Sequence, residues 1–539
     1  MTSPPDDARA APPRLASAGE STPREPTAPQ TRGAARVAAG IFASRVSGFI
    51  QRRVFAYYFG SSDYADAWTA ALRLPNVVQN LLGEGTLSAS LIPVYADLVE
   101  RGSEEDARRF AGAALGILMV VAGALALVGY ALAPLLVALF FPEWDAAKRE
   151  LTTVLVRVLF PMTGVLVISA WALGILNSHR RFFVSYVAPV LWNLAMIAAM
   201  IGGAVYLGLE AQSRDLVLAL AWGALLGGFL QLGFQLPFVL PVLGGLRLSL
   251  GRGVTGVQEA VRNFWPVVAA RGVVNLSGWI DLILAGLLTS GAVAVMGYAQ
   301  TFYLLPISLF GMSIAASELP ELSRMRGDAE RVVATRVSSA LARVAYFLIP
   351  SMLVYLALGD VVVAALFETG EFGPAESLVT WGVLAAYALG LPASGSSRVM
   401  QSAFYALRDT RTPARVAYLR VALSAGVGIG LMFPADRIGF GSLRLGAAGL
   451  AVGATVGAWV EYVLLRRALG RRIGPHGHGA GRALRVGLAG AAATATGVAL
   501  QVLLPPAHPI LTAAETLVPA GVVFLVTAAL LGEARPRIR

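Results

Sequence analysis

The sequence consists mainly of long apolar segments separated by short polar loops. Each segment contains the roughly 20 apolar residues that a helix needs to cross the hydrocarbon of a bilayer. The strands of a membrane β-barrel alternate apolar and polar residues, and this pattern is missing here. The sequence therefore predicts an all-α polytopic membrane protein with about 14 transmembrane helices. We expect them near residues 35–59, 63–98, 109–140, 150–177, 183–208, 215–241, 257–289, 292–322, 332–358, 375–405, 413–433, 444–466, 482–504 and 511–532.

Proline residues fall inside several of these segments and predict kinks, because proline removes one helical hydrogen bond. We expect kinks at Pro75, Pro93, Pro306 and Pro320, which lie inside long segments. Residues 1–34 are instead rich in Pro, Ala, Ser and Thr and have no hydrophobic period. This composition predicts a disordered tail before the first helix.

The arginines in the loops predict the orientation of the chain. With an even number of helices both termini lie on one side, and the loops of that side hold most of the loop arginines, including the cluster between residues 466 and 485. The opposite loops hold Lys148, Arg149, Arg214, Arg437 and Arg444. Cytoplasmic loops carry an excess of basic residues, so we expect both termini in the cytoplasm.

A faint internal repeat predicts two lobes. Leu74-Pro75 and Leu305-Pro306 lie 231 residues apart, and the polar breaks at Asn177 and Arg408 have the same offset. We interpret residues 35–241 and 257–466 as two six-helix lobes around a central cavity, in parallel orientation. Residues 482–532 then form an added C-terminal helix pair. A chance match of Leu-Pro pairs is the alternative explanation.

Composition excludes several classes of function. The chain is 56% hydrophobic and 14% charged, has a net charge of +11, and contains no cysteine and four histidines, all in expected loops. Disulfides, zinc thiolates and a histidine metal centre within the membrane are therefore excluded, and we expect no metal and no cofactor. Basicity in a membrane protein first indicates orientation and anionic membrane lipids, not nucleic acid. No nucleotide-binding loop and no Ser/His/Asp set is present, which favours a transporter over an enzyme.

Ionised residues inside apolar segments are the candidate functional residues, because charge is costly at membrane depth. Arg45, Arg52, Arg73 and Arg271 lie in the first, second and seventh segments. A guanidinium group stays charged and binds phosphate oxygens through two parallel hydrogen bonds. We interpret the four as lining a wet cavity for an anionic head group. The alternative is that each pairs with a carboxylate between helices or extends to the membrane surface.

The second segment contains a Gly-Glu-Gly sequence formed by Gly83, Glu84 and Gly85. Glycine permits backbone conformations that break a helix. The sequence is equally consistent with a gating hinge and with a simple helix break.

Several short motifs resemble the MurJ/MviN lipid II flippase family of the multidrug/oligosaccharidyl-lipid/polysaccharide exporter superfamily. The matching residues are Ser44 to Phe49, Phe59-Gly60, Asp66-Ala67, Leu74-Pro75-Asn76, Gly83 to Gly85, Phe160-Pro161, Gly174 to Asn177, Arg181-Phe182, Ala188-Pro189, Gly370-Glu371-Phe372 and Asp409-Thr410. They follow the family's order, and the expected helix count agrees with it.

The resemblance implies a bacterial inner-membrane flippase that moves lipid II, an undecaprenyl-pyrophosphate-linked precursor of peptidoglycan, from the inner to the outer leaflet by alternating access. It implies a hydrophobic groove at the last two helices for the lipid tail. It adds Ser44 and Asn76 to the substrate-binding cavity, and assigns gating or structural roles to Asp66 and Glu84. Cell-wall synthesis enzymes are further candidate partners.

The chain departs from the family pattern at three cavity positions. Gln51, Gln79 and Thr301 stand where the family has arginines. Arg52, Arg73 and Arg271 are the candidates to replace them. Two alternatives to lipid II transport therefore stay open: export of another polyprenyl-linked glycan or an amphiphilic drug, and a non-transporting scaffold for cell-wall enzymes.

Overall fold

Helices form nearly all of the computed structural model, which describes residues 29–324, 330–440, 443–477, 479–505 and 507–533. Among the described residues, ten helices are long and apolar enough to cross a membrane, and the pair α14–α15, bent by 44°, would add an eleventh. The prediction of an all-α polytopic protein is confirmed. The remaining three segments of the expected fourteen carry the charged residues of α1, α2 and α9, so the full count stays a prediction.

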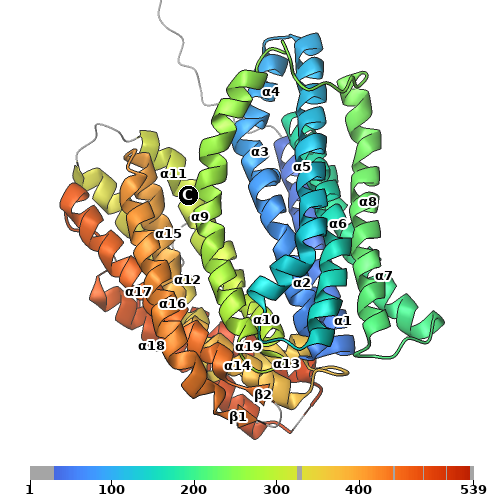
Figure 1. The fold of residues 1–539 in the computed structure, drawn as a ribbon. Coiled ribbons are helices and arrows are strands. Elements are labelled where there is room, and N and C mark those ends of the chain that lie inside the picture. Colours follow the sequence, from blue (N-terminus) through green and yellow to red (C-terminus); the bar gives the residue numbers. More distant parts are fainter. Residues whose placement is uncertain (1–28, 325–329, 441–442, 478, 506, 534–539) are drawn as a thin grey trace, which may run out of the picture.

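The first group of helices packs together on one side of the molecule (Figure 1). Its bounds are α1 (Pro29–Phe59), α2 (Asp63–Leu82), α3 (Glu84–Ser90), α4 (Ile92–Glu100), α5 (Glu104–Phe140), α6 (Ala146–Ser178), α7 (Phe182–Tyr206) and α8 (Arg214–Leu243). We refer to α1–α8 as the N-terminal group.

The second group begins with α9 (Val257–Gly286), which packs against α2 and α3 as well as against α10. It continues with α10 (Ala292–Pro306), the π-helix η1 (Ile307–Met312), α11 (Ser313–Arg324), α12 (Glu330–Ala357), α13 (Gly359–Phe367), α14 (Pro374–Ala388), α15 (Leu391–Ala406), α16 (Arg411–Asp436) and α17 (Gly446–Ile473). We refer to α9–α17 as the C-terminal group. The division of the chain into two six-helix lobes at residues 35–241 and 257–466 stays a proposal.

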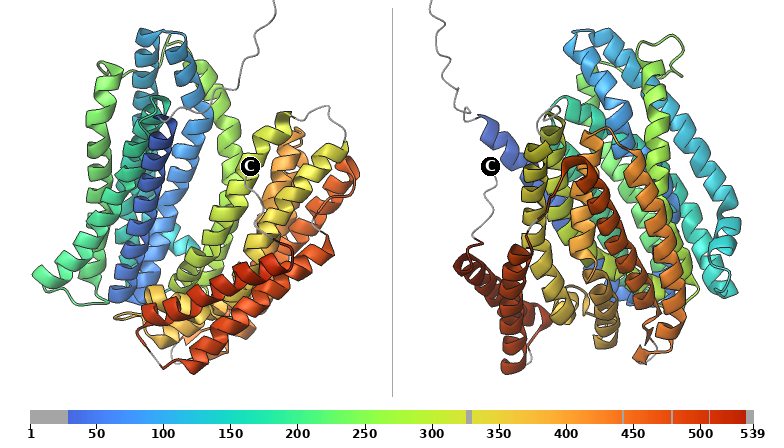
Figure 2. Two further views of the ribbon diagram at one scale, coloured as in Figure 1. Left: turned by 180° about the vertical axis from the view of Figure 1, so that it is seen from behind. Right: turned by 90° about the vertical axis from the view of Figure 1, so that its left-hand side faces the viewer.

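The last two helices, α18 (Ala480–Leu503) and α19 (Pro509–Leu530), pack on each other and on α12 and α13. They lie on the outside of the C-terminal group (Figure 2). The strands β1 (Gly439–Phe440) and β2 (Leu443–Arg444) form a two-residue antiparallel hairpin in which Gly439 faces Arg444 and Phe440 faces Leu443. The assignment of α18 and α19 as a separate C-terminal pair at residues 482–532 stays a proposal.

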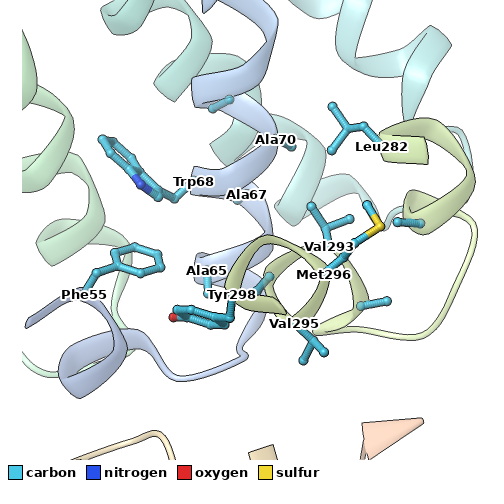
Figure 3. Packing of buried hydrophobic residues seen from close by; sticks show 14 of the residues in the cluster. Phe55, Ala65, Ala67, Trp68, Ala70, Leu282, Val293, Val295, Met296 and Tyr298 are labelled. Atoms are coloured by element: carbon cyan, nitrogen blue, oxygen red, sulfur yellow. The ribbon is translucent and has the colours of Figure 1, made fainter. Parts of the chain in front are cut away.

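The two groups meet at one end of the molecule and diverge at the other (Figures 1 and 2). One hydrophobic core is common to both groups at the end where they meet, which we call the closed end; there Phe55 and Trp68 pack near Tyr298 (Figure 3). Ring centroids of Phe55 lie 6.3 Å from Trp68 and 6.2 Å from Tyr298. Of two further cores, one lies within the C-terminal group, and the other joins α2–α6 and α8 of the N-terminal group to Val257 and Ala260 at the start of α9. Burial of apolar surface therefore joins the groups at the closed end and also along α9.

Four local features differ from the sequence predictions. Helix α1 begins at Pro29 and not at residue 35, with proline at the position where a first helical turn tolerates it. The expected second segment is divided at Gly83, where α2 ends. Pro75 lies inside α2 and does not end that helix. A π-helix follows Pro306. The short helix α13 and the hairpin were not predicted, because neither is long enough to appear as a membrane-spanning pattern.

Candidate functional site

Two adjoining hollows lie between the groups, and we call them together the central cavity. The first has a volume of about 360 Å³ and is lined by α1, α2, α7 and α10. The second, of about 400 Å³, is lined by α1, α10 and η1. They share Gly48 and Arg52 from α1 with Thr301 and Leu304 from α10. Residues from both groups therefore form one continuous polar and apolar wall.

Five of the six expected cavity residues line these hollows. Ser44 and Arg45 line the second hollow, Arg73 and Asn76 line the first, and Arg52 lines both. This arrangement follows from helix geometry, because Arg45 and Arg52 lie two turns apart on the same face of α1. The side chain of Arg271, in α9, lies outside the described residues.

Two of these arginines donate hydrogen bonds across the cavity to α10. Arg52 Nη1 donates to Thr301 Oγ1 at 2.7 Å. Arg73 donates to Gln300 Oε1 through Nη2 and to the carbonyl of Gly278 at 3.4 Å through Nη1. Within the described part of the chain, neither guanidinium forms an ion pair with a carboxylate. The cavity thus contains cationic groups whose hydrogen-bond partners are neutral.

Arginine 53, next to Arg52, has a different environment. Its Nη1 donates to the carbonyls of Ala365 and Leu366, both at 2.8 Å. These carbonyls belong to the last turn of α13, where carbonyl groups lack helical partners. Arg53 therefore joins α1 to α13 and does not line the cavity.

Aspartate 66 lies at the closed end, 1% exposed, and not in the cavity. Its carboxylate accepts hydrogen bonds from the backbone amides of Gly291 and Ala294, each at 2.8 Å. These amides form the first turn of α10, where a negative charge is favourable. Lys148 Nζ lies 2.8 Å from Asp66 Oδ2 and 2.6 Å from Asp63 Oδ1. The network joins α2 and α6 of the N-terminal group to α10.

The Gly-Glu-Gly sequence coincides with the break between α2 and α3. Gly83 ends α2 with an extended backbone, and a Cβ atom there would lie 2.2 Å from the carbonyl oxygen of Gln79. Gly85 lies in the first turn of α3, and the side chain of Glu84 lies outside the described residues. The structure places a helix break at this position, and its role in gating remains a proposal.

The other positions that depart from the family pattern have different locations. Gln51 and Thr301 line the cavity, whereas Gln79 is not among its lining residues. Sequence reasoning missed Gln300 and Thr301 as hydrogen-bond partners of the arginines, and it missed the role of Lys148. Lys148 is the only lysine of the chain, which was the one available signal.

Other arginines of the membrane segments form ion pairs, as the alternative interpretation expected. Arg420 in α16 lies 2.7 Å from Glu461 in α17, whose side chain is 1% exposed. Glu318 in α11 pairs with Arg336 and Arg343 of α12. Helix pairing thus explains these groups, which lie outside the central cavity.

Beside the last helices lies an apolar groove of about 750 Å³. Its walls are α12 and α18, and its lining residues are Leu353, Leu356, Ala357, Ala491, Thr494, Ala495, Val498, Ala499, Val502 and Leu503. Such a groove fits a hydrocarbon chain, because nearly all of its surface is apolar.

Comparison with known proteins agrees with this architecture. The solved structure titled "Lipid II flippase MurJ, inward closed conformation" has a TM-score of 0.73, with 20% identity over 92% of this chain and 98% of that one. An inward-facing multidrug resistance transporter of the MATE family has a TM-score of 0.64, with 15% identity over 82% of this chain and 98% of that one. Both show that the fold is shared.

Relatives by sequence identify the family. The probable lipid II flippase MurJ of Rhizobium meliloti is 30% identical over 437 residues, which cover 80% of this chain and 79% of that protein. The lipid II flippase MurJ of Burkholderia cenocepacia is 29% identical over 436 residues, with 80% and 81% covered. The sequence model of the family "Lipid II flippase MurJ" matches residues 55–507. The chain therefore belongs to the MurJ family of lipid II flippases.

Proposed function

We propose that this chain moves lipid II from the inner to the outer leaflet of the bacterial inner membrane by alternating access. The observation that carries the proposal is the position of Arg45, Arg52 and Arg73 around one cavity between the two helix groups. A pyrophosphate linked to sugars and a peptide cannot cross hydrocarbon without a large desolvation cost. Cationic groups in a wet cavity remove most of that cost.

The two parts of the substrate require different surroundings. The diphosphate head would lie in the central cavity, where guanidinium groups can bind its oxygens bidentately. The polyprenyl tail would lie in the apolar groove of α12 and α18. The division of the ligand between the two sites keeps the tail in an apolar environment during transport.

The closed end supplies the second element of alternating access. The network of Asp66, Lys148 and α10 closes this end, while the groups diverge at the end where α1 begins. With the termini in the cytoplasm, as the loop arginines favour, the cavity would face the cytoplasm and the closed end would face outward. In the opposite state, the cytoplasmic end would close and the outward end would open, and the head group would be released at the outer leaflet.

Alternatives have less support. The relatives carry the name of lipid II flippases, which favours neither a drug exporter nor a scaffold. A flippase moves its substrate across the membrane without forming or breaking a covalent bond. We therefore assign no catalytic residue. Cell-wall synthesis enzymes remain proposed partners, because they would consume lipid II at the outer leaflet.

The test measures lipid II accessibility in the outer leaflet of cells depleted of their own flippase. We expect the chain to restore accessibility and Arg45→Ala to abolish it at equal expression. The control is Arg437→Ala, which removes an exposed arginine after α16 and should restore accessibility fully. Equal activity of Arg45→Ala and the unaltered chain would contradict the proposal.

A further inference from the structure

Consecutive residues of α10 hold the two arginines that reach across the cavity. Thr301 accepts from Arg52 of α1 at 2.7 Å, and Gln300 accepts from Arg73 of α2. Both arginines belong to the N-terminal group, and both acceptors belong to the C-terminal group. The two hydrogen bonds therefore connect the groups through the cavity itself.

The chemistry of Thr301 fits a role as acceptor. Its hydroxyl has one hydrogen, which it donates to the carbonyl of Gly297 at 3.0 Å. Only the lone pairs of Oγ1 are then available to Arg52. The hydroxyl is held in one orientation and presents a neutral oxygen to the guanidinium.

The side-chain amide of Gln300 is also oriented as an acceptor, because Tyr387 binds its nitrogen. Its amide nitrogen donates to the hydroxyl of Tyr387 in α14 at 3.1 Å, which leaves the amide oxygen to face Arg73. Arginine has only donors, so no other orientation of the amide would satisfy both neighbours. The ring of Tyr387 stacks on Tyr303 at a centroid distance of 4.9 Å, which fixes this partner within the C-terminal group.

Neutral oxygens are weaker partners for a guanidinium than phosphate oxygens. The present bonds already have an ionised donor, but a phosphate adds a full negative charge on the acceptor and bidentate geometry. A diphosphate in the cavity would therefore compete successfully with Thr301 and Gln300 for the two arginines. Its binding would replace two bonds between the groups by bonds to the ligand.

We propose that Gln300 and Thr301 are resting acceptors, which hold Arg52 and Arg73 in the empty cavity and release them to a diphosphate ligand. This inference rests on the proposed function and adds to it a specificity device. The resting acceptors position the guanidinium groups through neutral oxygens, while the carboxylate of Asp281 in α9 acts on Arg73 electrostatically without a hydrogen bond among the described contacts. They also couple occupancy of the cavity to the separation of α1 and α2 from α10.

The experiment measures binding of inorganic pyrophosphate to the purified full-length protein in detergent by calorimetry. Thr301→Val removes the acceptor at nearly constant shape, and we expect about tenfold tighter binding, the size of one hydrogen bond to a charged group. Gln300→Leu should act in the same direction. Thr301→Ser keeps the hydroxyl and should bind pyrophosphate as the unaltered chain does.

Thr163→Val is the matched control. Thr163 in α6 also donates to the carbonyl four residues earlier, at 3.1 Å, but it is not among the residues that line the cavity. We expect its affinity for pyrophosphate to be unchanged. A purely structural role of Thr301 would weaken binding in Thr301→Val, so a gain in affinity separates the two roles.

Gln300→Glu provides an independent variant should Thr301→Val fail to fold. A fixed carboxylate beside Arg73 would compete with the ligand as an ion pair, and we expect at least about tenfold weaker binding. Unchanged or tighter binding in this variant would overturn the inference.

The remaining outcomes distinguish the inference from the proposed function. Arg52→Ala and Arg73→Ala should each weaken binding of pyrophosphate. If they do, but Thr301→Val and Gln300→Leu bind no more tightly than the unaltered chain, the resting acceptors are wrong and the cationic cavity stands. If the unaltered chain does not bind pyrophosphate at all, both the inference and the proposed function fail.

Discussion

Lys148 and Asp66 form a buried ion pair, with Nζ 2.8 Å from Oδ2 and side chains 5% and 2% exposed. The pair joins the first turn of α6 to α2, and Asp66 also accepts two amide hydrogens of α10. Lys148 Nζ additionally lies 4.3 Å from the ring centroid of Trp144. The buried carboxylate of Asp66 thus connects α2, α6 and α10, which come from both groups, at the closed end.

Removal of Lys148 should therefore destabilise the protein strongly. Lys148→Met leaves Asp66 buried without its cation, which typically costs about 3–5 kcal/mol. The double variant Lys148→Met/Asp66→Asn should recover part of this loss, because it removes both charges. Unfolding of the purified proteins in detergent measures the effect.

The exposed pair of Arg214 and Glu150 provides the comparison. Its atoms lie 2.9 Å apart, but the side chains are 47% and 65% exposed. Arg214→Met should change stability by less than about 1 kcal/mol. Similar losses for Lys148→Met and Arg214→Met would show that the buried network contributes little.

The neighbouring residues Arg52 and Arg53 should separate binding from stability. Arg53→Ala removes two hydrogen bonds to the end of α13 and should lower the free energy of unfolding by about 1.5–3 kcal/mol. Its affinity for pyrophosphate should stay unchanged. Arg52→Ala should do the reverse, with weaker pyrophosphate binding and a smaller change in stability. Calorimetry and thermal unfolding of the same preparations measure the two effects. Weaker pyrophosphate binding in Arg53→Ala, with unchanged binding in Arg52→Ala, would contradict this assignment.

Glycine 370 should tolerate no side chain. Its φ of +55° is in the left-handed region, and a Cβ atom would lie 2.3 Å from the carbonyl oxygen of Tyr57. That oxygen also accepts the amide hydrogen of Glu371 at 2.9 Å, so it cannot move without breaking the contact between α1 and the segment after α13. We expect Gly370→Ala to cost roughly 3 kcal/mol in stability.

Gly102 is the control for Gly370. Its φ is +73°, but no atom lies within 4 Å of the added Cβ. Gly102→Ala should therefore cost only the conformational strain, about 1 kcal/mol. The midpoints of thermal unfolding compare the two, and equal midpoints would mean that the contact with Tyr57 relaxes freely.

Asp409, in the loop between α15 and α16, should give the stability of the protein a dependence on acid pH. The backbone amide of Thr412, at 3.0 Å, is the main cause that lowers the pKa of this carboxyl, and Arg472, at 2.6 Å, lowers it further. A lowered pKa means that the folded state favours the ionised form. The contribution to stability is complete above about pH 4, the usual pKa of aspartate, and is lost as pH falls through the lowered pKa.

Asp409→Asn tests this expectation. The variant should unfold at a lower temperature than the unaltered chain at pH 7, and the difference should shrink as the pH falls below about 4. Thr412→Val removes the hydroxyl but keeps the backbone amide, so it should retain most of the pH dependence. A difference that stays constant from pH 7 to 2.5 would mean that the charge of Asp409 is unimportant.

The sequence predicted the helices well because each membrane segment has a local signal, a run of apolar residues ended by polar ones. It also placed Arg45, Arg52 and Arg73 together, since helix periodicity and neighbouring segments determine which faces meet. The partners of these arginines were not predictable. Arg52 and Thr301 are 249 residues apart, and no local pattern indicates which side chain a distant helix presents.

The same limit explains the missed role of Lys148. The residue lies near the start of α6, where a basic side chain is ordinary at a membrane surface, and 82 residues separate it from Asp66. Helix α13 was missed for a different reason. Its nine residues are apolar but too few to cross a membrane, so it was left in the loop between the expected segments 332–358 and 375–405.

The core at the closed end can be completed only late in synthesis, because its residues come from both halves of the chain. Phe55 and Trp68 are among the first residues to be inserted, but Tyr298, Phe367 and Phe372, which pack in the same core, follow more than two hundred residues later. The carboxylate of Asp66 likewise cannot accept its two amide hydrogen bonds until the first turn of α10 has been synthesised. The nascent N-terminal half must therefore remain in the membrane with an incomplete interface until α10 to α13 have been synthesised.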